Sequence, residues 1–200
     1  MQKYPKDVRI AFRHQPLPFH NHAMEAAEAS MAANAQGKFW EMHDKLFANQ
    51  QKLDRADLDG YAKEIGLDMN RFKADMDGHK HKDQIEADSK AGTSWGANGT
   101  PTLFVNGRQI VGAQPFSAFQ PLIDEEIKHA DKLLGEGVKM DGLYQKILDT
   151  LPAAPTPTAA PTQGANDNGP AKKYEIAIGD SPVKGPKNAP VTIMEFSDFQ

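Results

Sequence analysis

The sequence predicts an α/β protein in which a mostly helical segment is inserted between strands of one sheet. Two observations carry this prediction. Short apolar runs with strand character occur at 8–12, 102–111 and 191–196. Between the first two runs, the residues from His22 to about 92 show helical spacing and few strand signals. The fold class therefore combines a small sheet with a helical insertion.

The first strand and the helices follow from local signals. Val8–Phe12 alternates apolar and other residues after the turn signal at Tyr4–Asp7. Asp54 and Asp68 are placed as N-caps of short helices, and Gly66 lies where the first of these would stop. The predicted helical segments are two within 22–50, then 55–65, 69–77, 79–92, 116–134 and 139–150.

A hairpin is the strongest local prediction. Two apolar runs, 102–105 and 108–111, flank Asn106-Gly107. This dipeptide favours a two-residue turn because both positions accept a positive φ.

The clearest boundary is the segment from Leu151 to Lys172, which is rich in Pro, Ala and Thr. Such a segment cannot pack a core, so we interpret it as a linker with an r.m.s. span of roughly 25 Å. After it, Tyr174–Ile178 is a candidate strand, 179–190 is rich in turn signals, and Val191–Phe196 has the pattern of a buried strand.

Composition excludes several function classes. The formal net charge of -4 gives no reason to expect a nucleic-acid partner. No apolar run approaches the roughly 20 residues needed to span a bilayer, and the first residues lack the apolar stretch of a secretory signal. The sequence contains no cysteine, so it holds no disulfide, thiolate nucleophile or zinc–cysteine site.

Three motifs resemble the DsbA family of thioredoxin-fold thiol-disulfide oxidoreductases. They are Gly99-Thr100-Pro101-Thr102 with the strand after it, Phe12–His20 before an Ala-rich helix, and Gly37–His43. The match covers most of residues 5–130 and implies a thioredoxin-like fold with a helical insertion.

The last residues, 189–200, resemble the opening strand of the same family, which ordinarily runs into Cys-x-x-Cys at the next position. Residues 1–5 resemble the tail of the helix that begins at that cysteine pair. The implied layout is therefore the C-terminal two-thirds of a DsbA-like domain in 1–150, a linker in 151–172, and the N-terminal strands of a second or permuted unit in 173–200.

Two origins fit this order: a tandem protein of which the chain spans two domains, or a permuted or truncated arrangement. We favour the tandem fragment. In either case Val191–Phe196 is expected to lie parallel to Val8–Phe12, with the 102–111 hairpin antiparallel on its other side. The strand completes the sheet either within one chain or by exchange in a swapped dimer.

The resemblance assigns a substrate-docking role to two residues. In the family the proline of this motif is cis, and the residue before it offers its backbone to an extended substrate. Pro101 is thus the predicted cis-proline and Thr100 the predicted substrate-contacting residue. The alternative is an ordinary loop leading into a strand, since only about 5–6% of X–Pro bonds in folded proteins are cis.

Glu195 is the candidate catalytic acid. It interrupts an otherwise apolar strand, so burial should raise its pKa. In the resembled family an acid at the same distance before the first cysteine helps to move protons during exchange. The alternative, a glutamate on the solvated face of an edge strand, has equal weight.

Other polar and aromatic groups suggest no further chemistry. His14, His20, His22, His79 and His81 lack a completing acidic or cysteine partner, so we expect no metal site and no cofactor. An aromatic set is interpreted as core of the helical insertion rather than a ligand cage: Phe39, Trp40, Phe47, Phe72 and Trp95.

The resemblance implies a parent enzyme that acts on protein disulfides in the periplasm or cell envelope, with cysteine-containing substrates and a redox partner protein. The present residues alone should be redox-inactive because they contain no cysteine. The rival hypothesis is a redox-dead thioredoxin-like module that binds peptides, and a metal-storage or sensing domain is a weaker third. Oxidase, reductase and isomerase remain open, because the residues between the cysteines set the redox potential.

Overall fold

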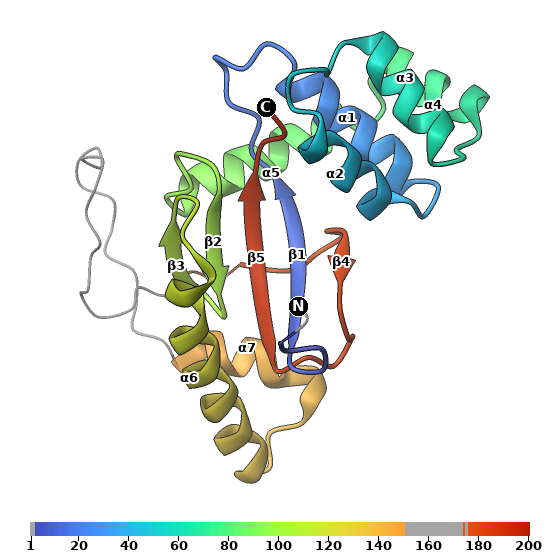
Figure 1. The fold of residues 1–200 in the computed structure, drawn as a ribbon. Helices are drawn as coiled ribbons and strands as arrows, with labels where there is room; N and C mark the ends of the chain where they lie inside the picture. The colour runs from blue at the N-terminus through green and yellow to red at the C-terminus, as the bar shows by residue number, and fades with distance from the viewer. Residues whose placement is uncertain (1–2, 151–173, 175) are drawn as a thin grey trace. The chain divides into compact units, whose positions relative to one another are not determined.

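The computed structural model describes residues 3–150, 174 and 176–200. It contains a five-stranded sheet in the order β3-β2-β5-β1-β4 (Figure 1). The strands are β1 Val8–His14, β2 Thr102–Val105, β3 Arg108–Val111, β4 Val183–Lys184 and β5 Val191–Ser197. The helices are α1 Ala23–Asn34, α2 Phe39–Ala48, α3 Arg55–Glu64, α4 Met69–Asp77, α5 Lys82–Ser94, α6 Phe116–Gly135 and α7 Met140–Thr150.

The chain forms two compact units. Of the described residues, unit 1 comprises 3–11, 103–150, 174, 176–179 and 185–195, and unit 2 comprises 12–102, 180–184 and 196–200.

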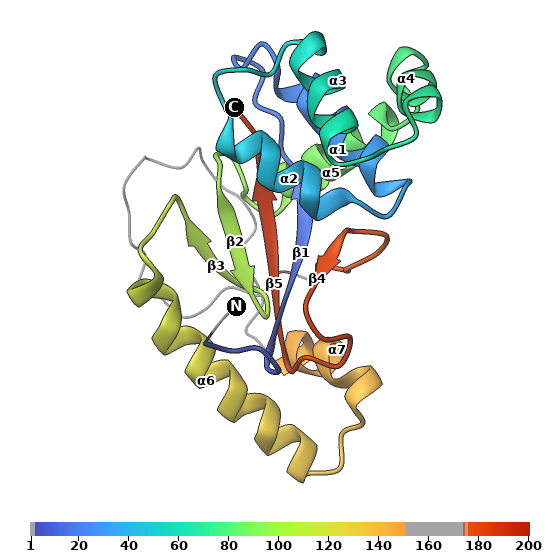
Figure 2. The same ribbon diagram turned by 45° about the vertical axis from the view of Figure 1, so that its right-hand side comes forward.

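In unit 1, β5 and β1 are parallel neighbours (Figures 1 and 2). The Val191 N–H donates to the Asp7 carbonyl at 2.9 Å, which sets their register where both strands begin. The β2–β3 hairpin flanks β5 on its other side, and its turn residues Asn106 and Gly107 have φ values of 47° and 86°. Helix α6 buries Ile123 in a core that includes Val105, Val191 and Ile193. The predicted hairpin and the position of the C-terminal strand are thus confirmed.

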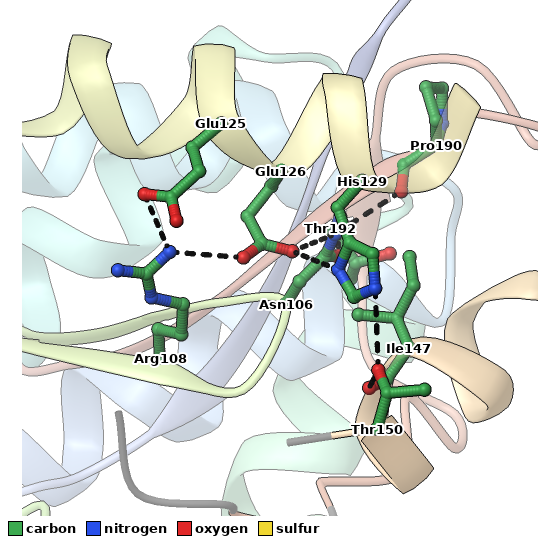
Figure 3. A network of polar contacts seen from close by, with 9 residues as sticks. All are labelled: Asn106, Arg108, Glu125, Glu126, His129, Ile147, Thr150, Pro190 and Thr192. Carbon is green, nitrogen blue, oxygen red and sulfur yellow. Dashed lines mark hydrogen bonds and ion pairs between the residues drawn. The ribbon is translucent and has the colours of Figure 1, made fainter. Parts of the chain in front are cut away.

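A buried polar network ties β5 to the hairpin and to α6 (Figure 3). The Asn106 N–H donates to the Thr192 carbonyl, and the Thr192 N–H donates to the Asn106 side-chain Oδ1, both at 2.8 Å. The Asn106 amide also donates to the Glu126 Oε2 at 3.2 Å and to the Pro190 carbonyl at 3.4 Å. One fully buried side chain therefore fixes the register of the C-terminal strand.

The Glu126 carboxylate has further partners in the same network (Figure 3). The Arg108 guanidinium donates to its Oε1 at 3.3 Å and forms a 2.9 Å ion pair with exposed Glu125. The His129 ring lies 3.7 Å from the other oxygen, and its Nε2 is 3.4 Å from the Thr150 hydroxyl at the end of α7. A buried carboxylate is tolerated when it is paired and hydrogen-bonded in this way.

In unit 2, helices α1 to α5 pack around a core of buried side chains drawn mainly from α1, α2 and α3. Small residues allow close packing along α1, where Ala26, Ala29, Ala32 and Ala33 are fully buried. The Asp68 side chain accepts hydrogen bonds from the Asn70 and Arg71 N–H groups, as its assignment as an N-cap predicts. Asp54 occupies the other N-cap position without a side-chain hydrogen bond to the helix.

Three local predictions need correction. The described residues of 174–178 form no strand; the Ile176 N–H donates to the Tyr174 carbonyl at 3.0 Å, and the Ile176 carbonyl accepts from the Tyr144 hydroxyl at 2.9 Å. A tertiary contact thus replaces the strand partner. The helix expected over 79–92 begins at Lys82, because His79 has a φ of 48°. The predicted turn region 179–190 contains the short strand β4.

The proposed linker, Leu151 to Lys172, lies outside the described residues.

Candidate functional site

Three segments of unit 2 meet at the edge of the sheet where β1 and β5 end (Figures 1 and 2). The Gln15 N–H donates to the Ser197 carbonyl at 2.9 Å, which joins the segments that follow β1 and β5. Strand β2 is the antiparallel neighbour of β5, so its first residue, Thr102, lies at the same edge. The carboxyl ends of parallel strands are a common place for ligand sites in α/β proteins.

The loop before β2 carries the two predicted docking residues. The Thr100–Pro101 peptide bond is cis, as the motif predicts. The Thr102 hydroxyl donates to the Gly99 carbonyl at 2.7 Å, and Thr102 is fully buried. This contact closes the loop on itself and holds Thr100 and Pro101 directly before the start of β2.

Helix α5 approaches this edge through a glycine. A Cβ at Gly92 would lie 2.6 Å from the Gln15 Oε1 and 2.7 Å from the Phe196 ring. Real Cβ contacts of this length do not occur, so glycine is required for the helix to pack here. The sequence analysis did not select Gly92, because a glycine inside a helical pattern carries no sign of what it will contact.

Asp198 is a polar residue of the edge that the sequence analysis missed. Its Oδ2 accepts from the Leu17 N–H at 2.7 Å and contacts the His20 Nδ1 at 2.9 Å, while its Oδ1 accepts from the Gln200 N–H at 3.0 Å. Its side chain is 1% exposed. We call Asp198, His20 and the loop 15–22 the Asp198 clamp. An aspartate directly after a buried strand was the available signal, since such residues cap turns.

Glu195 occupies β5, which is an interior strand and not the edge strand of the alternative interpretation. Its side chain is partly buried, and no hydrogen bond or ion pair reaches its carboxylate from residues that the structure describes. Burial raises the pKa of Glu195 from 4.5 to about 7. The carboxyl group can therefore exchange a proton near neutral pH.

The five histidines considered as metal ligands, His14, His20, His22, His79 and His81, have separate partners or none. His20 contacts Asp198, His22 lies 3.5 Å from Asp54, and His79 lies 3.0 Å from Glu28. His14 is buried, and neither of its ring nitrogens has a hydrogen-bond partner. His81 lies 3.6 Å from Asp75. Within 3–150, 174 and 176–200, no group of three or more His, Asp or Glu side chains is arranged to hold a metal ion.

The aromatic set packs as core in unit 2. Phe39 and Phe72 are buried, and Trp40 and Phe47 pack against the same cluster. Trp95 instead contacts Phe196 near the sheet edge, with ring centroids 5.9 Å apart.

Curated relatives match about half of the chain. It is 45% identical over 107 residues to a protein named Na(+)/H(+) antiporter NhaA of Herminiimonas arsenicoxydans, a match that covers 54% of the chain and 17% of the relative. It is 41% identical over 118 residues to the antiporter NhaA 1 of Salinispora arenicola, and 42% identical over 117 residues to NhaA 3 of Salinispora tropica. Each of these two matches covers 58% of the chain and 18% of the relative, so the chain spans less than a fifth of the length of these proteins.

Solved structures give no match. Within the part of the chain that the structure describes, no helix is long and apolar enough to cross a membrane.

A family model for the DSBA-like thioredoxin domain matches residues 1–124, which include the first strand, the helical insertion and the Thr100–Pro101 loop. The chain belongs to the DSBA-like thioredoxin domain family.

Proposed function

We propose that this chain is part of a thiol-disulfide oxidoreductase that acts on protein disulfides in the periplasm or cell envelope. In this proposal the Thr100–Pro101 loop holds an extended substrate segment, and Glu195 exchanges the proton. The cysteine pair lies outside the 200 residues, which contain no cysteine and are therefore redox-inactive by themselves. Cysteine-containing proteins are the proposed substrates, together with a redox partner protein.

The observation that carries this proposal is the convergence of three segments at one sheet edge in unit 2. The residues after β5 and those after β1 are joined by the Gln15–Ser197 hydrogen bond, and the loop with Thr100 precedes β2 at the same edge. A backbone segment held at the end of a strand can pair with an extended peptide through its own N–H and C=O groups. Side chains of the substrate then contribute only specificity.

Glu195 supports a proton-transfer role. Thiol-disulfide exchange requires a thiolate to attack and a thiol to be regenerated, so a proton has to leave and return at each step. A general acid or base is most effective when its pKa is close to the working pH, and the pKa of Glu195 is about 7. A carboxylate paired with a cation would keep a lower pKa and serve less well.

The domain layout is part of the proposal. Residues 1–150 belong to one DsbA-like domain, 151–172 link it to the next, and 173–200 begin a second domain whose strand β5 completes the first sheet. In an exchanged dimer, β5 of one copy would occupy the same position in another. Ion transport is not carried over from the antiporter relatives, because the matched region is only 17–18% of their length.

Absence of cysteine supports a second candidate, a redox-dead module that binds extended peptides without chemistry. The two candidates share the Thr100–Pro101 docking loop and differ in the sequence beyond residue 200. We expect the parent reading frame to encode Cys-x-x-Cys directly after Gln200. A frame that continues without this pair would favour the binding module.

The docking loop itself is tested on the 200-residue protein. An unstructured ten-residue peptide with serine in place of cysteine is titrated into the ¹⁵N-labelled chain. We expect the largest amide shifts at Gly99, Thr100 and Thr102, and no turnover in an insulin-reduction assay. Saturable shifts confined to other segments, or measurable turnover, would contradict the proposal.

A further inference from the structure

An open pocket of about 270 Å³ lies in unit 2, and its wall does not include the Thr100–Pro101 loop. The wall combines an imidazole, a carboxylate and two thioethers, which belong to His79, Glu28, Met24 and Met76. Met24 and Glu28 are four positions apart on α1, so their side chains lie on the same face of this helix. Met76 lies in the last turn of α4, and His79 follows it in the link to α5. The packing of α1 against α4 thus brings four groups with metal-ligand chemistry to one pocket.

The His79 ring is oriented by Glu28. Its Nδ1 lies 3.0 Å and 3.2 Å from the two carboxylate oxygens of Glu28, whose side chain is 4% exposed. A carboxylate only accepts hydrogen bonds, so it favours the neutral ring with the hydrogen on Nδ1 and a lone pair on Nε2. Histidines that bind metal ions are commonly held in this way by a carboxylate on the other ring nitrogen. The His79 side chain is otherwise 69% exposed, so an ion can reach it.

The backbone at His79 is fixed in an unusual conformation. Its φ of 48° lies in the left-handed region, which residues other than glycine seldom adopt. The His79 N–H donates to the Met76 carbonyl at 3.2 Å, which sets the spacing between this imidazole and the Met76 thioether. Residues held in this region concentrate at ligand sites, where the surrounding structure maintains them. A ligand role for His79 accounts for a conformation that the link between α4 and α5 does not otherwise require.

The charges around the pocket favour a cation. The Glu25 carboxylate also lines the pocket and has no hydrogen bond or ion pair with residues that the structure describes. Two cationic side chains share the wall, and each has its own carboxylate. The Arg55 guanidinium donates to Asp77 at 2.7 Å, and the Lys82 Nζ lies 3.8 Å from Glu86. A positive ion in the pocket would therefore compensate Glu25 without displacing an existing ion pair.

The donor types decide the class of ion. Calcium and magnesium take about six or more oxygen ligands, and zinc takes about three or four His, Cys or carboxylate ligands. No group of three or more His, Asp or Glu side chains fit for this occurs among the described residues. Thioether sulfur prefers soft ions such as copper(I), for which imidazole is also a suitable ligand. We propose that Met24, Met76 and the His79 Nε2 bind a soft monovalent metal ion of the copper(I) class, and that Glu28 is the positioning residue for the His79 ring. This site is separate from the proposed thiol-disulfide chemistry.

The experiment titrates Ag⁺ into the full 200-residue chain labelled with ¹³C at the methionine methyl groups. Ag⁺ is soft and monovalent like copper(I) but is not oxidised in air, and the chain has no cysteine to compete for it. Among the eight methionines, we expect the methyl signals of Met24 and Met76 to shift together and to saturate at one ion per chain. Shifts confined to other methionines, or gradual shifts of all of them without saturation, would overturn the inference.

Variants assign the ligands. His79→Ala and Met24→Leu each remove one donor from a side chain that is not fully buried, and each should raise the dissociation constant for Ag⁺ at least about 10-fold. Met69→Leu is the matched control, because Met69 packs partly buried against the core of the same unit but does not line the pocket. It should change the dissociation constant less than about 2-fold. Urea unfolding establishes that each variant is folded. Equal affinities for His79→Ala and Met69→Leu in folded protein would refute the site.

The positioning role of Glu28 has its own readout. Ring ¹⁵N chemical shifts of His79 report which nitrogen carries the hydrogen. Glu28→Gln keeps an acceptor oxygen, so the hydrogen should stay on Nδ1 and the affinity for Ag⁺ should fall less than about 3-fold. Glu28→Ala removes the acceptor, so both tautomers should be populated and the affinity should fall about 10-fold. The same tautomer and the same affinity in the two variants would show that Glu28 does not position His79.

Discussion

In unit 1, Glu126 on α6 is buried and Glu195 on β5 is partly buried, and the two carboxyl groups have opposite surroundings. The Glu126 carboxylate meets Asn106, Arg108 and His129 (Figure 3). Glu195 meets no hydrogen-bond donor among the described residues, and burial raises its pKa to about 7. A paired carboxylate can hold elements together, whereas one without a partner costs stability and gains a titration near neutral pH.

The contrast fits a structural role for Glu126 and the proton-transfer role that we propose for Glu195. Removing a partner from the Glu126 network would leave buried polar groups unsatisfied. Removing the charge of Glu195 would relieve a desolvation cost. Stability measurements on the two sites should therefore change in opposite directions.

The largest expected effect on the free energy of unfolding concerns His14. This residue is a buried base in unit 2, so the comparison of buried ionisable groups extends to that unit. Burial, followed by the charges of His81, Arg13 and His43, lowers the pKa of His14 from 6.5 to about 3. The unfolded chain then binds more protons between these values, so stability is lost as pH falls from 6.5 to 3, by up to about 5 kcal/mol. His14→Phe should flatten this part of the pH profile of the unfolding free energy, measured with urea.

The control for His14 is His22→Gln, because the His22 side chain is 38% exposed. It should keep the slope of the unmodified chain. An equal slope for His14→Phe and the unmodified chain between pH 6.5 and 3 would show that His14 does not stay neutral in the folded state.

The second effect is loss of the buried hydrogen bonds that Asn106 forms with Thr192 and Glu126. Asn106→Ala removes the acceptor of the Thr192 N–H and the donor to Glu126, both buried, so we expect a loss of about 3 kcal/mol in urea unfolding. Glu125→Gln alters only an exposed partner of Arg108 and should cost less than about 0.5 kcal/mol. Similar losses of unfolding free energy in the two variants would show that the buried contacts of Asn106 stabilise the protein no more than the exposed ion pair of Glu125.

The smallest expected effect is a gain in stability, on replacement of Glu195. The folded-state pKa of Glu195 lies above its unfolded value, so the folded chain binds more protons between pH 4.5 and 7, and stability falls as pH rises through that window. Glu195→Gln should therefore stabilise the protein above pH 7 by about 2 kcal/mol, after allowance for partial exposure, and change little at pH 4. Destabilisation at pH 8 would indicate that the carboxylate has a partner in solution.

Local chemistry made parts of the fold predictable. Asn106-Gly107 encodes a turn that both residues can adopt without neighbours, and Asp68 caps the helix that follows it in sequence. The position of β5 was predicted from resemblance to a family, since an apolar strand by itself does not specify its neighbour. The strand expected at 174–178 was wrong because the Tyr144 hydroxyl, distant in sequence, takes the carbonyl that a strand partner would have used.

The candidate site was predicted only in part. Thr100, Pro101 and Glu195 lie in recognisable motifs, and the pKa expected for Glu195 agrees in direction with the structure. Asp198 and Gly92 were missed, because their roles depend on contacts between the loop after β1, the segment after β5 and helix α5.

By itself, the sequence determined the helices, the strands β1, β2, β3 and β5, the hairpin turn, the family and the absence of any thiol, because each depends on residues close together in the chain or on composition. The tertiary structure decided which buried charges have partners. Glu126 and Glu195 are the same residue type, and only the neighbours brought to them by folding make one a structural anchor and the other an acid with a pKa of about 7. Burial and pairing are properties of the folded surroundings, so residue identity cannot specify them.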